Sequence, residues 1–423
     1  MGFFTGQGIA FEAVFAQPQP GFEDRAILTR LVQMIDATPP GATIHATVFR
    51  LTDEAVRDAL LAARDRGTSV HVLANGRGAA DAVGASLSRP PPDGLGDAHR
   101  WAGRPFDPTG GCSAYGAIAS GPESDLHTKL VLFSATNGPD ERPRPSVSWW
   151  SSTNLSRGSG TLKSNNAVAV YDDPVLFEGF RTRLWTSMWD GRHVPRNDFY
   201  NGSRGRGSFL GSPPSRTKVF CSPEQGTDLW VSRLASVVVD DGTAVDVAHA
   251  RFTDARVGVA RELARIAAQG GHVRVLVGPH PDFLGREVRG ILDAAGIPLR
   301  RADTHDKLAL VHSRHALSRR PRKLVLSGSH NLNYDANYRN DEILVKTFHD
   351  ELYDDMRDNH FARIWAAGRP VTDEPVGGVA DLADRGPQPP AMAPITMNGS
   401  LPLTTSSGSG SSGDSWETSS SQA

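Results

Sequence analysis

The chain contains an internal repeat, and this feature restricts its fold more than any other. A segment near the N-terminus that begins "EAVFAQPQPG" aligns with a later segment that begins "TKVFCSPEQG". In this alignment Val14 and Phe15 fall on Val219 and Phe220. A chain of 423 residues is long enough to bury two such units. The sequence therefore predicts two similar halves.

Each copy alternates predicted helices with predicted strands. The stretches "RAILTRLVQMID" and "LWVSRLASVVV" are typical of helices, and "TIHATVFRL" and "AVDVAHARF", which follow them, are typical of strands. A further helix begins at Asp53 in one copy and at Asp254 in the other, where a side-chain oxygen can accept the unpaired amide hydrogens of the first turn. We expect an α/β fold in which each half is a mostly parallel sheet flanked by helices.

The repeated unit carries the same pair of polar residues in both copies. His127 and Lys129 stand in "SDLHTKLVLF", and His305 and Lys307 stand in "THDKLALVHS". A single His-x-Lys pair is expected by chance in many proteins. Two pairs at the same place of a repeated unit indicate instead that both halves contribute to one site.

A strand and an asparagine follow each pair. Asn154 lies in "SWWSSTNLS", and Asn331 lies in "LSGSHNLN". Eleven residues beyond these asparagines stand Asn165 and Glu342, at equivalent positions of the repeat. The two halves therefore share a pattern of histidine, lysine and asparagine, and they differ in the charge of the last position.

These motifs resemble those of the phospholipase D superfamily, whose mark is two HxKxxxxD motifs, each followed by a GSxxN-like segment. The resemblance covers roughly residues 12–367 and includes the duplication. It implies two phospholipase D-like halves packed about a pseudo-two-fold axis. This sequence departs from the family because Ser134 and His312 replace both aspartates. The loss resembles that in tyrosyl-DNA phosphodiesterases, which remain active, since the aspartate mostly supports structure in the family.

The resemblance also implies a chemistry that uses no metal and no cofactor. A phosphodiester is an anion, so its reaction needs positive donors, a nucleophile and an acid for the leaving oxygen. Lys129 and Lys307 supply charge, and the two asparagines supply amide donors. One histidine attacks phosphorus to form a phosphohistidine, while the other protonates the leaving oxygen.

The resemblance further implies a role for the last position of each pattern, which accepts a hydrogen bond from a histidine's other ring nitrogen. We take Asn165 as the partner of His127, and Glu342 as the partner of His305. Because a carboxylate raises the pKa of an imidazolium, this pairing favours His127 as the nucleophile and His305 as the general acid. The neighbouring Asn166 and Asp341 are alternative partners.

Candidates for substrate binding are Ser152, Ser329, Trp149 and Trp150. For the serines, capping of a turn is an equally good interpretation, and for the tryptophans, burial in an apolar strand is the alternative. Residues 75–126 are rich in Gly and Pro and lead into His127, so we expect a lid or binding loop. The basic residues 314–324 are expected to form a solvated hairpin, with contact to a polyanion as the alternative.

The repeat and the composition divide the chain into five segments. They are a leader segment at 1–11, the first half at 12–200, a linker at 201–216, the second half at 217–367, and a disordered tail rich in Pro, Gly and Ser at 368–423. Because the duplication supplies both half-sites, a monomer is sufficient.

Composition says little about the partners and the cellular location of the protein. The formal net charge of −2 gives no overall field that attracts nucleic acid or an anionic membrane. No apolar run is long enough for a membrane-spanning helix. The N-terminus lacks the basic region of a signal peptide, so we interpret it as mature chain; secreted and cytoplasmic locations both stay open. Cys112 and Cys221 fit one disulfide or two thiols, and they match no metal site.

Three functions agree with the sequence. The favoured one is a phospholipase D-like enzyme that hydrolyses or transfers a phosphatidyl or related group, because the chain is not basic overall. A nuclease or DNA-end phosphodiesterase is the alternative, supported by the missing aspartates and the basic residues 314–324. A degenerate phosphate-binding module is the third. The sequence specifies neither the head group nor the acceptor alcohol.

Overall fold

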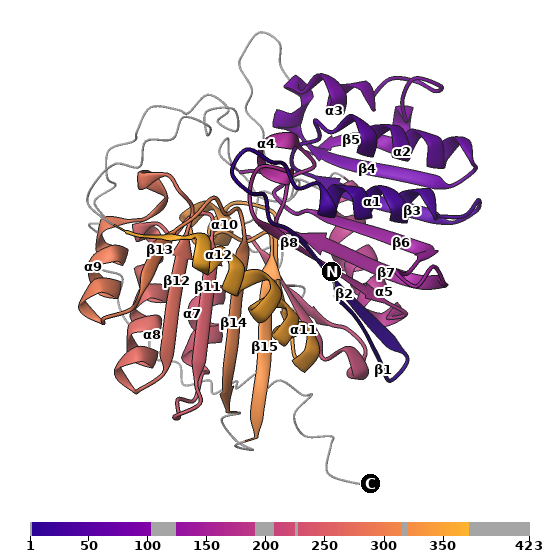
Figure 1. The fold of residues 1–423 in the computed structure, drawn as a ribbon. Coiled ribbons are helices and arrows are strands. Elements are labelled where there is room, and N and C mark those ends of the chain that lie inside the picture. Colours follow the sequence, from indigo (N-terminus) through magenta and orange to yellow (C-terminus); the bar gives the residue numbers. More distant parts are fainter. Residues whose placement is uncertain (1, 103–123, 191–206, 225–226, 315–319, 372–423) are drawn as a thin grey trace, which may run out of the picture.

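The computed structural model describes residues 2–102, 124–190, 207–224, 227–314 and 320–371. It contains two mixed sheets, one from each half, with helices packed against them (Figure 1). The predicted α/β class and the two similar halves are confirmed. In Figure 1 the first half runs from indigo to magenta, and the second half runs from pink to yellow.

The first half builds an eight-stranded sheet. Its strands lie in the spatial order β1 (Gly2–Gly6), β2 (Ile9–Ala16), β8 (Asn165–Tyr171), β7 (Pro143–Ser151), β6 (Leu130–Asn137), β3 (Thr43–Val48), β4 (Ser69–Asn75) and β5 (His99–Ala102). Its α-helices are α1 (Ala26–Asp36), α2 (Glu54–Asp65), α3 (Ala82–Ser86), α4 (Arg157–Gly160), α5 (Pro174–Glu178) and α6 (Thr186–Trp189). A π-helical stretch at Gly179–Trp185 joins the last two.

The second half builds a nine-stranded sheet. Its strands lie in the order β17 (Arg369–Pro370), β13 (Leu299–Arg301), β12 (His272–Val277), β11 (Ala244–His249), β14 (Lys307–Arg314), β15 (Pro321–Gly328), β16 (Glu342–Thr347), β10 (Thr217–Ser222) and β9 (Ser208–Leu210). Its α-helices are α7 (Leu229–Ala235), α8 (Val257–Ala268), α9 (Arg286–Ala294), α10 (Tyr334–Tyr338), α11 (Asp350–Asp355) and α12 (Ala362–Ala367). A π-helical stretch at Met356–Phe361 again joins the last two.

The prediction that each sheet is mostly parallel is wrong. Only β3, β4 and β5 in the first sheet, and β11, β12 and β13 in the second, pair in parallel. The other described pairs in both sheets are antiparallel. For β6 with β7 and for β14 with β15, the reason is a short connection, which allows only antiparallel pairing.

Strands of the two sheets also lie in the predicted leader, linker and tail segments. Residues 2–11 form β1 and the start of β2, which pairs with β8, so they belong to the first sheet. Residues 208–210 form β9, which pairs with β10, and residues 369–370 form β17, which pairs with β13. Short edge strands carry too little hydrophobic pattern to be predicted from sequence. The rest of the predicted tail, from residue 372, lies outside the described residues.

The predicted lid is partly regular structure. Within residues 76–102, a 3-10 turn, α3 and a second 3-10 turn lead to β5, which extends the first sheet. Residues 103–123, which include Cys112, lie outside the described residues. Cys221 is buried in β10, and burial raises the pKa of its thiol.

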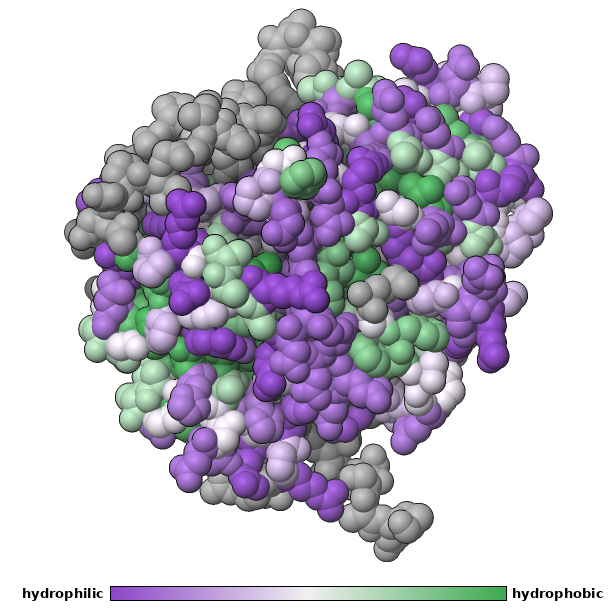
Figure 2. All heavy atoms as spheres, viewed as in Figure 1, coloured by the Kyte–Doolittle hydropathy of each residue, from purple (hydrophilic) through white to green (hydrophobic). Residues whose placement is uncertain are grey.

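Apolar side chains form three cores. One packs α1 and α2 against the first sheet, and an equivalent one packs α7, α8 and α9 against the second. The third joins the halves, because it contains strand residues from both sheets together with residues of 174–189 and 350–367. None of the described helices is long and apolar enough to cross a membrane. The face in Figure 2 is mainly hydrophilic, with scattered apolar patches.

Reciprocal backbone contacts connect the halves next to the His-x-Lys pairs. Leu126 forms a bridge with Asp341, and Ser164 forms the equivalent bridge with Thr304. The residue before each predicted catalytic histidine is therefore paired with the residue before Glu342 or Asn165 of the opposite half. These bridges bring His127 next to Glu342 and His305 next to Asn165.

A buried polar network also links the halves at Asp306, between the second histidine and lysine. The side-chain amide of Asn166 donates to Asp306 Oδ1 at 2.6 Å, and His360 Nε2 lies 3.0 Å from the same oxygen. The Thr304 hydroxyl donates to Oδ2 at 2.7 Å. Burial acts to raise the pKa of Asp306, but the interactions with His360, Asn166 and Thr304 outweigh it, so the pKa is lowered.

Loss of this carboxylate should destabilise the protein. We expect Asp306→Ala to lower the free energy of unfolding by about 3 kcal/mol at neutral pH, since it leaves buried partners unsatisfied. Because the pKa is lowered by folding, the contribution is present above the unfolded pKa and is lost as pH falls through the folded pKa. Urea denaturation at several pH values measures both effects. Exposed Asp303 provides the control; an equal loss for Asp303→Ala would contradict the role of the network.

Candidate active site

Both His-x-Lys pairs lie at the start of equivalent strands where the halves meet. His127 and Lys129 lead into β6, and Lys307 is the first residue of β14. Side chains two apart in extended chain point to the same face, so each histidine shares a face with its lysine. The charges of Lys129 and Lys307 both lower the pKa of His127, which places groups from both halves in one electrostatic cluster.

The polar partners of the histidines are exchanged between the halves. Nδ1 of His127 lies 2.8 Å from Oε2 of Glu342, and both side chains are buried. Nδ1 of His305 lies 3.0 Å from the Ser152 carbonyl oxygen and 3.3 Å from Oδ1 of Asn165. The prediction that each histidine pairs within its own half is therefore wrong. The carboxylate serves His127, and the amide serves His305.

The alternative partners take other roles. The Asn166 side chain donates to Asp306, and the Asp341 carbonyl accepts from the amides of His127 and Thr128 at 3.0 and 2.9 Å. Neither side chain replaces Glu342 or Asn165, which contact the histidines in the exchanged arrangement.

The side chain of Asn165 is held in one orientation. Its Nδ2 donates to the carbonyl oxygens of Ser159 at 2.6 Å and Lys163 at 2.9 Å, so its Oδ1 faces His305. Nδ1 of each histidine thus lies near oxygen acceptors, and Nδ1 of His305 also lies 2.9 Å from Nζ of Lys307. An imidazole that donates from Nδ1 leaves Nε2 for the substrate, as a lone pair when neutral or as a proton donor when charged.

The two lysines are buried beside the histidines. Lys129 Nζ donates to the His127 carbonyl at 2.6 Å, and Lys307 Nζ donates to the carbonyls of His305 at 2.6 Å and Ser152 at 3.2 Å. Nζ of Lys307 also lies 2.9 Å from Nδ1 of His305. Burial, followed by repulsion from Lys129, lowers the pKa of Lys307 well below its ordinary value. A bound anion would offset both the burial of the Lys307 charge and its repulsion from Lys129.

The surroundings of both imidazoles favour the neutral form. Burial, and then the charges of Lys129 and Lys307, lowers the pKa of His127 well below its ordinary value. Burial, and then Lys307 and Lys163, does the same for His305. An anion placed between the lysines would offset their charge and raise both pKa values.

Asn154 and Asn331 follow β7 and β15, the strands that pair with the two strands after the His-x-Lys pairs. This pairing brings each asparagine to the same end of its sheet as its histidine. The side-chain oxygens of both asparagines have no hydrogen-bond partner among the described residues. Their amide groups are therefore suited to contact a ligand.

The hydroxyls of the two predicted serines are used within the protein. Ser152 Oγ donates to Asn165 Oδ1 at 2.9 Å and accepts from the Asn166 amide at 3.0 Å. Ser329 Oγ accepts from the Ile343 amide at 3.0 Å. The serines thus connect the asparagine turns to β8 and β16, which agrees with the structural interpretation.

Both predicted tryptophans are buried and do not line a channel. Trp149 and Trp150 are each 1% exposed and lie in different cores, because consecutive strand residues point to opposite faces. Nε1 of Trp150 donates to Ser327 Oγ at 3.0 Å, so this ring bridges the halves. An apolar strand with no turn signal favoured this burial.

The positions of the missing aspartates have structural contacts. Ser134 Oγ accepts from the Thr43 amide at 2.8 Å, and Nδ1 of His312 lies 3.0 Å from the Gly242 carbonyl oxygen. Both contacts secure the segment that leads into a central parallel strand. They lie beyond the site along β6 and β14, so the replacements leave the polar site residues in place.

Sequence reasoning missed Phe49 and the buried state of His330. The Phe49 ring lies edge-on to the His127 ring at 4.8 Å, and its centroid lies 5.0 Å from Lys129 Nζ. His330 accepts from Trp230 Nε1 at 3.1 Å, and burial lowers its pKa to about 3. A signal for Phe49 was its position in sequence, directly after the predicted strand that forms β3. This strand pairs with β6, the strand that follows His127 and Lys129.

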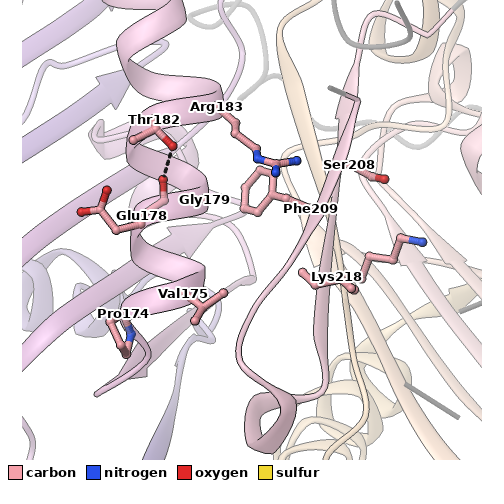
Figure 3. Close-up of a pocket in the computed structure, with 10 residues that line it drawn as sticks. Pro174, Val175, Glu178, Gly179, Thr182, Arg183, Ser208, Phe209 and Lys218 are labelled. Carbon is pink, nitrogen blue, oxygen red and sulfur yellow. Dashed lines mark hydrogen bonds between the residues drawn. The ribbon is translucent and has the colours of Figure 1, made fainter. Parts of the chain in front are cut away.

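Two other features are remote from the site. The antiparallel pairing of β14 with β15 is confirmed; its last described pair, Arg314 with Pro321, lies at the end of β14 away from Lys307, and residues 315–319 lie outside the described residues. A pocket of about 700 Å³ lies between α5 with the following π-helical stretch and β9 with β10 (Figure 3). Its lining includes Arg183, Phe209 and Lys218, and it contains none of the predicted site residues.

The second half matches a known family. The family model described as cardiolipin synthase, PLD-like domain, matches residues 242–365, which contain His305, Lys307, Asn331 and Glu342. No sequence among curated proteins matches the chain.

Solved structures were also compared with the chain. Phosphatidylserine synthase from Haemophilus influenzae is 12% identical, with a TM-score of 0.53, and the match covers 87% of this chain and 89% of that one. Nuc from Salmonella typhimurium, a phospholipase D family member, is 23% identical over 37% of this chain and 97% of its own, with a TM-score of 0.30. Polyphosphate kinase from Porphyromonas gingivalis is 14% identical over 82% of this chain and 49% of its own, with a TM-score of 0.45.

The likeness to the synthase is one of fold, and it extends over both halves. The family match adds the sequence pattern of the second half, and the first half repeats that pattern at His127 and Lys129. Residues 242–365 thus match the PLD-like domain family, and the fold of the whole chain resembles that of the synthase.

Proposed function

We propose that this protein is a metal-independent phosphodiesterase or transphosphatidylase that works through a phosphohistidine on His127. The observation that carries the proposal is the buried contact between His127 and Glu342, beside Lys129 and Lys307. A carboxylate stabilises the positive charge that develops on an imidazole ring when its other nitrogen bonds to phosphorus. This reason for His127 as the nucleophile differs from the one that the sequence suggested.

The substrate is held by positive and amide donors. Lys129 and Lys307 attract the non-bridging oxygens, and Asn154 and Asn331 donate to them. The bound anion raises the pKa of the histidines by offsetting the lysine charges. His305 then holds a proton on Nε2, while its Nδ1 donates to the oxygens that face it.

The reaction proceeds in two steps. In the first, Nε2 of His127 bonds to phosphorus, the bond from phosphorus to the leaving oxygen breaks, and His305 gives its Nε2 proton to that oxygen. In the second, water or an alcohol attacks phosphorus, His305 takes the proton of the attacking group, and the bond to His127 breaks. Water gives hydrolysis and an alcohol gives transfer, so one intermediate serves both outcomes.

Chelation provides the test. Because lysine and amide groups neutralise the phosphate, we expect hydrolysis of bis(p-nitrophenyl) phosphate to change by less than about twofold in excess EDTA. Release of p-nitrophenol measures the rate, and the His127→Ala protein, prepared in the same way, measures contaminating phosphodiesterases. Complete loss that only a divalent cation restores would refute the proposed chemistry.

A further inference from the structure

Phe49 contacts both residues of the first His-x-Lys pair. The centroid of its ring lies 4.8 Å from that of His127, with an angle of 67° between the two planes, and 5.0 Å from Nζ of Lys129. Aromatic rings favour such an edge-on arrangement, and the face of a phenyl ring attracts an ammonium group within about 6 Å. The ring therefore borders the pair on one side.

The pairing of two strands holds Phe49 in this position. Phe49 directly follows β3, which pairs with β6 up to Thr47 and Leu130. The Thr47 hydroxyl accepts from the Leu130 amide at 3.1 Å, so the strands are tied together two residues before Phe49 and one residue after Lys129. The place of the half-buried ring beside the pair therefore follows from the sheet itself.

The polar contacts of His127 leave one motion of its ring unrestrained. Its amide donates to the Asp341 carbonyl oxygen at 3.0 Å, and its Nδ1 lies 2.8 Å from Oε2 of Glu342. These contacts fix the backbone and one ring atom, but the ring can still turn about the Nδ1 contact, because the outer torsion of histidine is soft. Such a turn displaces Nε2, the atom that attacks phosphorus in the proposed reaction. Phe49 lies against the ring and opposes this motion.

The second half has no such ring beside its histidine. The repeat places Ala250 at the position of Phe49, and the Ala250 amide donates to the Asp306 carbonyl oxygen at 2.9 Å, so this residue also adjoins its His-x-Lys pair. In the parts of the chain that the structure describes, no aromatic ring contacts His305. The repeated fold therefore does not require an aromatic residue at this position, and the ring serves one histidine only.

We infer that Phe49 is a positioning residue for His127, and that its ring holds Nε2 on the line of attack on phosphorus. A misplacement of a reacting group by about 1 Å can cost about 10²-fold in rate, so a contact that fixes the ring affects the reaction without touching the substrate. A ring beside one histidine alone agrees with a single nucleophile. This inference rests on the proposed function and adds to it the residue that orients the nucleophile.

The first turnover of bis(p-nitrophenyl) phosphate, measured with enzyme in excess, tests the effect on attack. We expect Phe49→Ala to slow the release of p-nitrophenol by about tenfold, and Phe49→Leu, which keeps most of the apolar bulk, to slow it by less than about threefold. The inhibition constant of inorganic phosphate should stay within about twofold of wild type, because the lysines and amides that bind the anion remain. Melting temperatures show whether each variant is folded.

Phe283 provides the matched control in the second half. Its ring is half-buried and also lies beside a histidine and a cation, with centroid distances of 5.2 Å to the His280 ring and 4.8 Å to the Arg251 guanidinium. It contacts neither His-x-Lys pair among the described residues. The first-turnover rate of Phe283→Ala should therefore stay within about twofold of wild type.

Crystal structures of the wild type and of Phe49→Ala test the contact without catalysis. We expect one orientation of the His127 ring in the wild type and more than one in the variant, with His305 unchanged. Three results would overturn the inference: a His127 ring that keeps its single orientation in Phe49→Ala, equal losses of rate in Phe49→Ala and Phe283→Ala, or an inhibition constant of phosphate that rises as much as the rate falls. If the wild type releases no p-nitrophenol, the proposed function fails, whereas the crystal structures still decide whether Phe49 holds the ring.

Discussion

Replacing His127 with alanine should lower kcat/KM for every accepted phosphodiester by at least about 10³-fold, because the group that forms the covalent intermediate is lost. The loss should not depend on the leaving group, since the variant has no nucleophile to form the covalent intermediate with either kind of ester. Initial rates with bis(p-nitrophenyl) phosphate and with an alkyl ester measure it. Exposed His272 provides the control, and His272→Ala should retain full activity.

The fold of the His127→Ala protein is a separate question, because the imidazole is buried against Glu342 and Phe49. Thermal denaturation of the variant distinguishes lost chemistry from lost structure. A folded His127→Ala protein that retains near wild-type kcat/KM would contradict the role of His127 as nucleophile.

Glu342→Gln should lower kcat/KM by about 10²-fold, with a similar loss for a good and a poor leaving group. The carboxylate contacts His127, so the substitution removes the charge that stabilises the phosphorylated ring, although the amide oxygen of glutamine can still accept from Nδ1. Pairing within one half would predict a different result. In that case Glu342 would contact the general acid His305, and Glu342→Gln would lower kcat/KM mainly for the substrate with the poor leaving group.

Asn165 is the matched position in the other half. Because Asn165 contacts His305, Asn165→Ala should impair protonation of the leaving oxygen and should therefore affect the poor leaving group more than p-nitrophenol. The comparison of p-nitrophenyl and alkyl esters in both variants separates the two roles. A loss in Glu342→Gln that is confined to the alkyl ester, with no such bias in Asn165→Ala, would reverse the assignment of the histidines.

The fold could be predicted in outline because a repeat is visible in sequence. The aligned strands and helix starts at Asp53 and Asp254 predict equivalent α/β units, and two His-x-Lys pairs in these units predict one shared site. Strand direction could not be predicted in the same way. It depends on how the short connections after β6 and β14 return the chain, and hydrophobic patterns do not report this.

The exchange of partners could not be predicted from spacing. Glu342 and Asn165 follow the asparagine of their own half, so proximity in sequence suggested pairing within that half. The bridges of Leu126 with Asp341 and of Ser164 with Thr304 move these positions onto the opposite histidine. Such contacts exist only after the halves have packed, and only the three-dimensional arrangement identifies them.

The identity of the phosphorylated residue tests the central claim most directly. The wild-type protein and His305→Ala are mixed with bis(p-nitrophenyl) phosphate, quenched in alkali to preserve phosphohistidine, digested, and analysed by mass spectrometry. The account predicts an adduct on His127 in both proteins, and more of it in His305→Ala because release of the intermediate needs His305 as a base. An adduct on His305 in the wild type, or turnover with no adduct on either histidine, would contradict the account.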